Sequence, residues 1–214
     1  MRTEPGQLLL LLTWMSPAFP VGAFAYSHGL EWAIESGAVK DGAALKSWIE
    51  DLLTRGSGWN DAVLFARCWE EKPSELNELA LALAVSRERH LETTQLGRAF
   101  RIAAGVFAAP PLDDDEIAYP VAAGAACAAM GIGRDQALLA YLQGFSAALV
   151  SVAVRLVPIG QTAGLETLRD LAPVIASVAS RASSASLADL GAITIAADIA
   201  AMRHETQHSR VFRS

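Results

Sequence analysis

The chain has 214 residues, enough for one large domain or two small ones with a substantial buried core. Only 19% of the residues are charged and the mean hydropathy is +0.30, so we expect a large core and an additional apolar interface. The net charge of −6, without a run of lysines or arginines, argues against nucleic-acid binding, because neutralising phosphates requires clustered cations.

Apolar residues recur at helical spacing along nearly the whole chain, and no segment alternates as a half-buried strand would. The pattern predicts an all-α fold, with residues 1–214 forming a single-domain helical bundle of about ten helices. The nearly uncharged segment 117–157 is expected at the centre of the bundle. The other expected helices cover residues 8–14, 26–35, 43–54, 61–71, 74–87, 91–107, 165–180 and 187–204.

Proline, glycine and polar residues predict where the helices are interrupted. Residues 16–20 contain two prolines, which push the preceding residues out of the helical region. Loops are also expected at residues 55–58, 109–116, 158–161 and 181–186. Asn60 or Asp61 is expected to cap the helix that follows the loop at 55–58. Pro173 is expected to kink the helix over 165–180.

Two apolar segments resemble membrane-related signals. Residues 8–15 follow Arg2 and precede an Ala-x-Ala at 23–25, as in a secretory signal, but Glu4 cancels the charge of Arg2. The prolines at 17 and 20 also interrupt that pattern. Residues 136–154 carry no charge, yet their serines, alanines and glycines favour a buried core helix over a membrane span.

The two cysteines, Cys68 and Cys127, lie far apart within helical patterns. Their positions favour reduced core thiols over a disulfide, and therefore a cytoplasmic protein. Neither cysteine has the spacing of a metal-binding motif.

Residues 204–208 read His-Glu-Thr-Gln-His, the pattern in which two imidazoles on one helical face bind zinc and the glutamate acts as a general base. A zinc metallopeptidase is therefore the alternative function. A third ligand usually follows downstream, but only six residues remain, and His28 and His90 lie far upstream. Histidines four residues apart also occur simply because they share a helical face.

Residues 203–214 predict a flexible docking tail rather than a catalytic site. Arginines at 203, 210 and 213 alternate with Val211 and Phe212, and arginine and aromatic residues are enriched at interface hot spots. The charged run 87–90 is interpreted as a solvated helix face in preference to a partner-binding patch.

Five dispersed blocks of the sequence resemble the UreF family of urease accessory proteins. They span the chain in order: SPAFPVGAFAYSHGLE at 16–31; Arg87-Glu88 to Gly97-Arg98; YPVAAG at 119–124 with Gly131-Ile132; VSVAVRLVPIGQ at 150–161; and HETQ at 204–207 with RVFR at 210–213. Five blocks in the same order are far more specific than one five-residue motif.

This resemblance implies a cytoplasmic, all-α homodimer without catalytic activity and without a tightly bound cofactor. UreF-like proteins bind UreD, also called UreH, and recruit the GTPase UreG. The complex then meets the urease apoprotein, so that nickel is handled in the assembled complex. No nucleic acid or membrane is expected as a partner.

The resemblance and the character of the tail together assign partner-binding residues at both ends of the chain. They are Tyr26, Ser27, Glu31, His204, Glu205, Thr206, Gln207, Arg210, Phe212 and Arg213. No catalytic or metal-ligating residue is assigned.

Two positions depart from the pattern of the resembled family. Ala118 stands where relatives often have histidine, which puts a metal-handling role at that position in doubt. His208 stands where relatives commonly have an aromatic residue, and this difference completes the His-Glu-x-x-His string.

Overall fold

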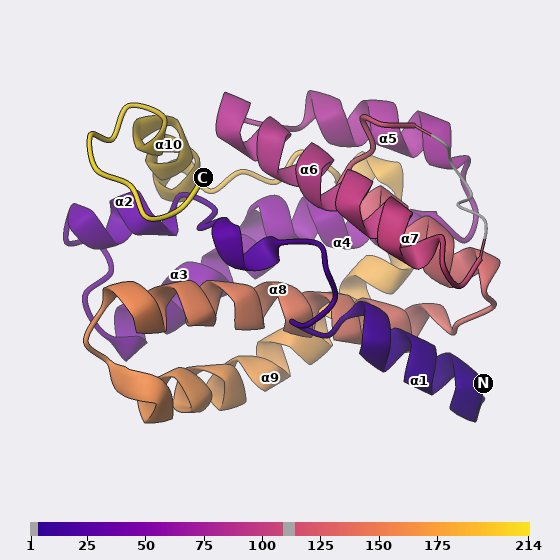
Figure 1. The fold of residues 1–214 in the computed structure, drawn as a ribbon, viewed down its shortest axis with the longest axis horizontal. Helices are drawn as coiled ribbons and strands as arrows, with labels where there is room; N and C mark the ends of the chain where they lie inside the picture. Colours follow the sequence, from indigo (N-terminus) through magenta and orange to yellow (C-terminus); the bar gives the residue numbers. More distant parts are fainter. Residues whose placement is uncertain (1–3, 109–113) are drawn as a thin grey trace.

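The computed structural model describes residues 4–108 and 114–214, and within these ranges the chain forms ten α-helices and two short 3-10 helices without a strand (Figure 1). The predicted all-α fold is confirmed. The elements are α1 (Pro5–Trp14), η1 (Ala23–Ala25), α2 (Leu30–Glu35), α3 (Gly42–Arg55), α4 (Ser57–Arg67), α5 (Pro73–Ala82), α6 (Arg87–Ala104), α7 (Tyr119–Ala129), α8 (Arg134–Leu156), α9 (Gly160–Ser184), η2 (Leu187–Asp189) and α10 (Ile195–His204).

Side-chain caps and prolines fix several helix starts. Asp41 accepts a hydrogen bond from the backbone N–H of Ala44 at 2.9 Å, and Ser86 accepts one from that of Arg89 at 3.1 Å. Each satisfies an amide that has no partner within its own helix. Pro73 occupies the first turn of α5, where a missing N–H costs nothing.

Two predicted loops and one predicted helix cap differ from the structure. The loop expected at 55–58 is nearly absent, because α3 ends at Arg55 and α4 already begins at Ser57. Asn60 and Asp61 therefore lie inside α4 and cannot cap it. The loop expected at 181–186 is shorter, since α9 runs through Pro173 to Ser184. Part of the expected loop 109–116 lies outside the described residues.

The helices expected at 26–35 and 187–204 begin later than predicted. Gly22, His28 and Gly29 have positive φ angles of 79°, 58° and 76°, so the helical path starts only at Leu30. Residues 190–194 form an irregular connection with Gly191 at a φ of 96°. Only the second half of the final predicted helix, α10, is therefore an α-helix.

The apolar helix α8 lies in the centre of the bundle and packs against α9, α4, α2 and α7 (Figure 1). Leu138, Leu142 and Val152 on α8 are fully buried. By length and composition α8 could cross a membrane, but half of its most apolar window is buried inside the structure. This location fits the predicted core helix.

The apolar segment at the start of the chain is also part of the core. Leu11 and Trp14 of α1 are buried, and the Trp14 ring packs edge-on against Phe100 at a centroid distance of 5.6 Å. The segment whose sequence resembles a secretory signal is therefore a helix packed against the core.

Gly97 of α6 lies directly against the backbone that leads into α7. A Cβ atom at this position would lie 1.9 Å from the carbonyl oxygen of Ile117, so only glycine permits this close approach. This contact anchors α6, which carries the buried charges described next.

Candidate functional site: the seat of the C-terminal segment

Helix α10 packs on α2 and α6, beside the first part of the chain (Figure 1). Its inner face is made of alanines, of which Ala197, Ala200 and Ala201 are buried. Gly29 is the N-cap of α2, and a Cβ there would lie 2.7 Å from the backbone nitrogen of Ala201. Small residues on both sides therefore bring the two backbones into direct contact.

Asn60 of α4 fixes the connection that leads into α10. Its Nδ2 donates to the carbonyl of Ala192 at 2.9 Å, and its Oδ1 accepts from the backbone N–H groups of Gly191 and Ala192 at 3.1 Å. The side chain expected to cap a helix instead satisfies three groups of an irregular segment.

After α10 the tail, residues 205–214, folds back over α2 (Figure 1). The Phe212 side chain is only 5% exposed, and the Arg155 guanidinium lies 4.5 Å from its ring centroid. The Arg213 N–H donates to the carbonyl of Ala25 at 2.8 Å, and the Ser27 N–H donates to that of Ser214 at 2.7 Å. In this conformation the tail, which the sequence predicts to be a flexible docking segment, contributes the side chain of Phe212 to the core.

Three buried carboxylates hold α10 and the tail; we call Glu31, Glu88 and Glu92 the carboxylate cluster. Glu31 accepts from the backbone N–H groups of Val211 at 2.7 Å and Phe212 at 2.9 Å. Each amide that enters the interior thereby gains a charged acceptor, which makes a stronger hydrogen bond than a neutral one.

His204 joins two members of the carboxylate cluster. Its Nδ1 lies 2.6 Å from Glu88 and its Nε2 lies 3.1 Å from Glu31. Glu88 also accepts from the Arg210 guanidinium at 2.6 Å. The last residue of α10 is thus tied to α2 and α6 at once.

Glu92, the third member, lies among cations and donors. It pairs with Arg89 at 2.7 Å, accepts from the Ser214 hydroxyl at 2.6 Å and lies 3.2 Å from His28 Nδ1. Burial alone would raise the pKa of Glu92, but Arg89 and His28 prevail and hold this pKa well below its usual value. Burial, reinforced by Arg89, lowers the pKa of His28, so this imidazole is neutral near pH 7.

The His-Glu-x-x-His string does not form a zinc-binding face. Helix α10 ends at His204, and His208 lies beyond it, exposed. Both ring nitrogens of His204 already contact carboxylates. Among residues 4–108 and 114–214 no group of three or more His, Cys, Asp and Glu side chains has a metal-binding arrangement. The geometry of the zinc-peptidase alternative is therefore not found.

Another arrangement has the connectivity of a hydrolase triad. His28 Nε2 lies 2.6 Å from the Ser57 hydroxyl, and His28 Nδ1 faces Glu92. The hollow beside Ser57 measures only about 30 Å³, room for one or two waters. A substrate has no space there, and Glu92 is already paired with Arg89. We interpret the three side chains as structural.

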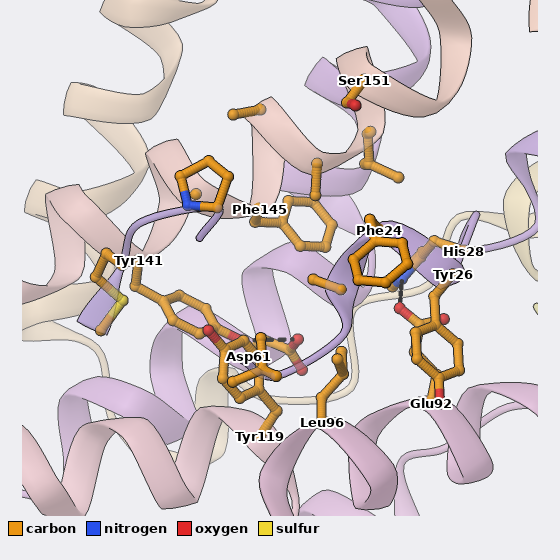
Figure 2. A pocket seen from close by; sticks show the side chains of 18 of the residues that line it. Phe24, Tyr26, His28, Asp61, Glu92, Leu96, Tyr119, Tyr141, Phe145 and Ser151 are labelled. Carbon is orange, nitrogen blue, oxygen red and sulfur yellow. Dashed lines mark hydrogen bonds and ion pairs between the residues drawn. The ribbon is translucent and has the colours of Figure 1, made fainter. Parts of the chain in front are cut away.

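A larger cavity of about 230 Å³ is lined in part by His28 and Glu92 (Figure 2). Asp61 and Tyr141 meet in it, with 3.3 Å between the Tyr141 hydroxyl and the Asp61 carboxylate. Burial raises the pKa of Asp61 to about 6, partly offset by the nearby Arg89. Phe24, at the opposite part of the lining, is 69% exposed.

We call the surface of α2 and α6 that holds α10 and the tail, together with the carboxylate cluster, the seat. The ten residues assigned from the sequence lie in or around this seat. Buried are Tyr26, Ser27, Glu31, His204 and Phe212; partly or fully exposed are Glu205, Thr206, Gln207, Arg210 and Arg213. The buried five are turned toward the chain itself, so in this conformation they shape the seat rather than present a surface.

Sequence reasoning missed the charged residues of α6. Residues 87–90 were predicted as a solvated face, but Glu88 and Arg89 are each 8% exposed. A signal was present: Arg89 continues the buried stripe of Thr93, Leu96 and Phe100 at helical spacing. Ala118 is buried at the N-cap of α7, where its methyl group offers no metal ligand.

The comparisons with known proteins agree with the sequence blocks. A family model described as UreF matches residues 39–172. The urease accessory protein UreF 1 of Brucella canis is 49% identical over 214 residues, covering 97% of this chain and 94% of that protein. The chain belongs to the UreF family of urease accessory proteins.

Other UreF proteins are similarly close. The UreF of Allorhizobium ampelinum is 49% identical over 221 residues, which cover 97% of this chain and 96% of that protein. The UreF of Methylobacterium sp. (strain 4-46) is 47% identical over 220 residues, which cover 96% of this chain and 88% of that protein. The family model matches the central part of the chain, and the similarity to these proteins extends over nearly all of it.

Proposed function

We propose that this UreF-family protein is a non-catalytic nickel-insertion chaperone that bridges UreD/UreH and the GTPase UreG during maturation of urease. The observation that carries this proposal is the similarity to urease accessory proteins along 97% of the chain. Nickel is then a cargo of the assembled complex with the urease apoprotein, the chain has no resident cofactor, and its compartment is the cytoplasm.

The outer face of α10 supports a docking role. Ile195, Ile199 and Met202 are 67%, 46% and 48% exposed, and their spacing of four and three residues places them in one stripe. Apolar side chains aligned on an exposed helix face mark interaction sites. We assign this stripe, with the adjacent exposed Arg210 and Val211, to UreD/UreH.

The buried residues of the seat contribute indirectly to this docking. Glu31 and His204 fix the direction of α10 and of the tail, so their substitution would disorder the stripe without removing a direct contact. Among the exposed tail residues, Arg210 is 41% exposed even while it pairs with Glu88. It can therefore meet a partner's carboxylate without leaving the seat.

A second apolar surface supports the homodimer. Leu8, Leu9 and Leu12 of α1 are 47%, 67% and 60% exposed, while Leu11 and Trp14 on the other face are buried. A helix that is apolar on its inner and outer faces is typical of an interface. We assign the outer face of α1 to a second copy of the chain.

Reconstitution tests the proposal. UreD/UreH, UreG, urease apoprotein and nickel are combined with and without this chain, and urease activity is measured over time. Activation is expected only when the chain is present. Equal activation without it would refute the chaperone role.

A further inference from the structure

The cavity beside the seat is built from α1, α4, α6, α7 and α8 and from the loop that follows α1. Asp61 comes from α4, Arg89 and Glu92 from α6, Tyr119 from α7, and Tyr141 and Phe145 from α8. Figure 2 shows Asp61 beside the rings of Tyr119 and Tyr141, with Phe145 above them and Leu96 to the right. Helices distant in sequence thus form one enclosed wall.

The charges in this wall do not balance. Arg89 and Glu92 are paired with each other at 2.7 Å, and His28 is neutral near pH 7. No lysine or arginine lies within ion-pair distance of Asp61 in the part of the chain that the structure describes. When Asp61 is ionised, the cavity wall therefore carries a net charge of one negative, although the nearby Arg89 also acts on Asp61.

Most of the remaining wall is aromatic or aliphatic. The rings of Tyr119 and Tyr141 lie beside Asp61 with centroids 5.5 Å apart. Other rings that line the cavity belong to Trp14, Phe24, Tyr26 and Phe145. A carboxylate among aromatic rings favours an organic cation, because ring faces attract positive charge and disfavour anions.

We propose that this cavity binds an alkylammonium group, whose nitrogen pairs with Asp61 while its carbon atoms lie against Phe145 and Leu96. A volume of about 230 Å³, below the range of about 300–1,000 Å³ typical of drug-sized ligands, selects a chain of a few carbons. Metal binding fits less well, since the described residues offer no three ligands in a metal-binding arrangement. This site differs from the docking surfaces proposed on α10 and α1, which are formed by exposed side chains on the outer faces of those helices.

The test is a protein-observed NMR titration at pH 7.5 with n-butylammonium, and with 1-butanol and butyrate as neutral and anionic analogues of similar length. Butylammonium is expected to give saturable shifts of signals from α4 and α8, with a Kd at least about tenfold lower than that of butanol. Butyrate is expected not to bind. Asp61→Asn should remove the preference for the cation, while Asp170→Asn, the same change on the exposed face of α9, should keep it.

Two sources can supply the group, a free amine or a lysine side chain of another protein. Nα-acetyl-lysine amide distinguishes them: equal or tighter binding than butylammonium points to a lysine, and binding of butylammonium alone points to a free amine. The proposal is overturned if wild-type protein shows no saturable shift, or binds butanol as well as butylammonium. Unchanged cation binding by a folded Asp61→Asn variant also overturns it.

Discussion

Replacing Glu31 by glutamine tests whether the carboxylate cluster holds the tail. The carboxylate is 5% exposed; one oxygen accepts from Val211, and the other accepts from Phe212 and contacts His204. Glutamine keeps the size of the side chain but supplies only one acceptor oxygen. Its NH₂ group must then face an N–H group or the His204 ring, and at least one buried donor loses its partner.

A hydrogen bond to a charged group contributes about 1.5–3 kcal/mol, and an orphaned buried donor costs a comparable amount. We therefore expect Glu31→Gln to weaken docking of the tail by about 2–3 kcal/mol, after allowing for the bond that glutamine retains. At 1.4 kcal/mol per factor of ten, amide exchange at Val211 and Phe212 should accelerate about 30- to 150-fold. Hydrogen–deuterium exchange read out by NMR measures this directly.

The matched control is Glu35→Gln, one turn further along the same part of the chain, where an exposed carboxylate accepts from the side chain of Gln207. This variant should leave exchange at Val211 and Phe212 within about twofold of wild type, because exposed pairs contribute little. Equal exchange rates in Glu31→Gln and wild type would refute the assigned role of the carboxylate cluster.

Three further predictions concern the close approach at Gly97, the connection to α10 held by Asn60, and the cavity around Asp61. Gly97→Ala should lower the free energy of unfolding by about 3 kcal/mol or more in denaturant titrations, whereas Gly6→Ala, with open space at its Cβ, should not. Asn60→Ala should lose three hydrogen bonds and increase deuterium uptake at residues 190–204, while α3 stays protected. Asp61→Asn should raise the free energy of unfolding at pH 7.5 by about 2–3 kcal/mol. Between pH 3.8 and about 6 the carboxyl of Asp61 holds a proton in the folded protein that the unfolded chain releases. The gain in the free energy of unfolding should therefore vanish below about pH 4. A gain that does not change with pH would contradict the assigned cost of burying the Asp61 charge.

Local chemistry made much of the helical order predictable. The two prolines at 17 and 20 end α1 in the expected place, and α5 starts at Pro73, one residue before the predicted start. The apolar run in α8 identified the core because a long uncharged helix must be buried in protein or in lipid. These inferences need only neighbouring residues.

The errors arose where distant residues decide the local structure. Residues 187–194 carry helical spacing, but Asn60, about 130 positions earlier, hydrogen-bonds their backbone in an irregular path. Glu88 and Arg89 look like solvated charges until His204 and Arg210 are placed beside them. No spacing rule reveals partners separated by more than a hundred residues.

The sequence predicted which residues belong to the candidate site better than it predicted how they are arranged. The family blocks brought Ser27, Glu31, His204 and Arg210 into one functional group, and the structure brings these residues together. Their burial was not foreseeable, since arginine and aromatic residues at the end of a chain suit an interface and a core equally well. The cavity around Asp61 gave no sequence signal, because its lining comes from α1 and the loop after it and from α4, α6, α7 and α8.

The most direct test of the account is the Kd between this protein and UreD/UreH, compared for wild type and the double variant Ile195→Glu/Ile199→Glu. Both isoleucines are exposed on α10, so the variant should fold normally, and Leu165→Glu on the exposed face of α9 serves as the control. If α10 docks through its outer stripe, two charges at its centre should weaken binding about 100-fold or more, while the control binds as wild type. Wild-type affinity in the double variant would contradict the account.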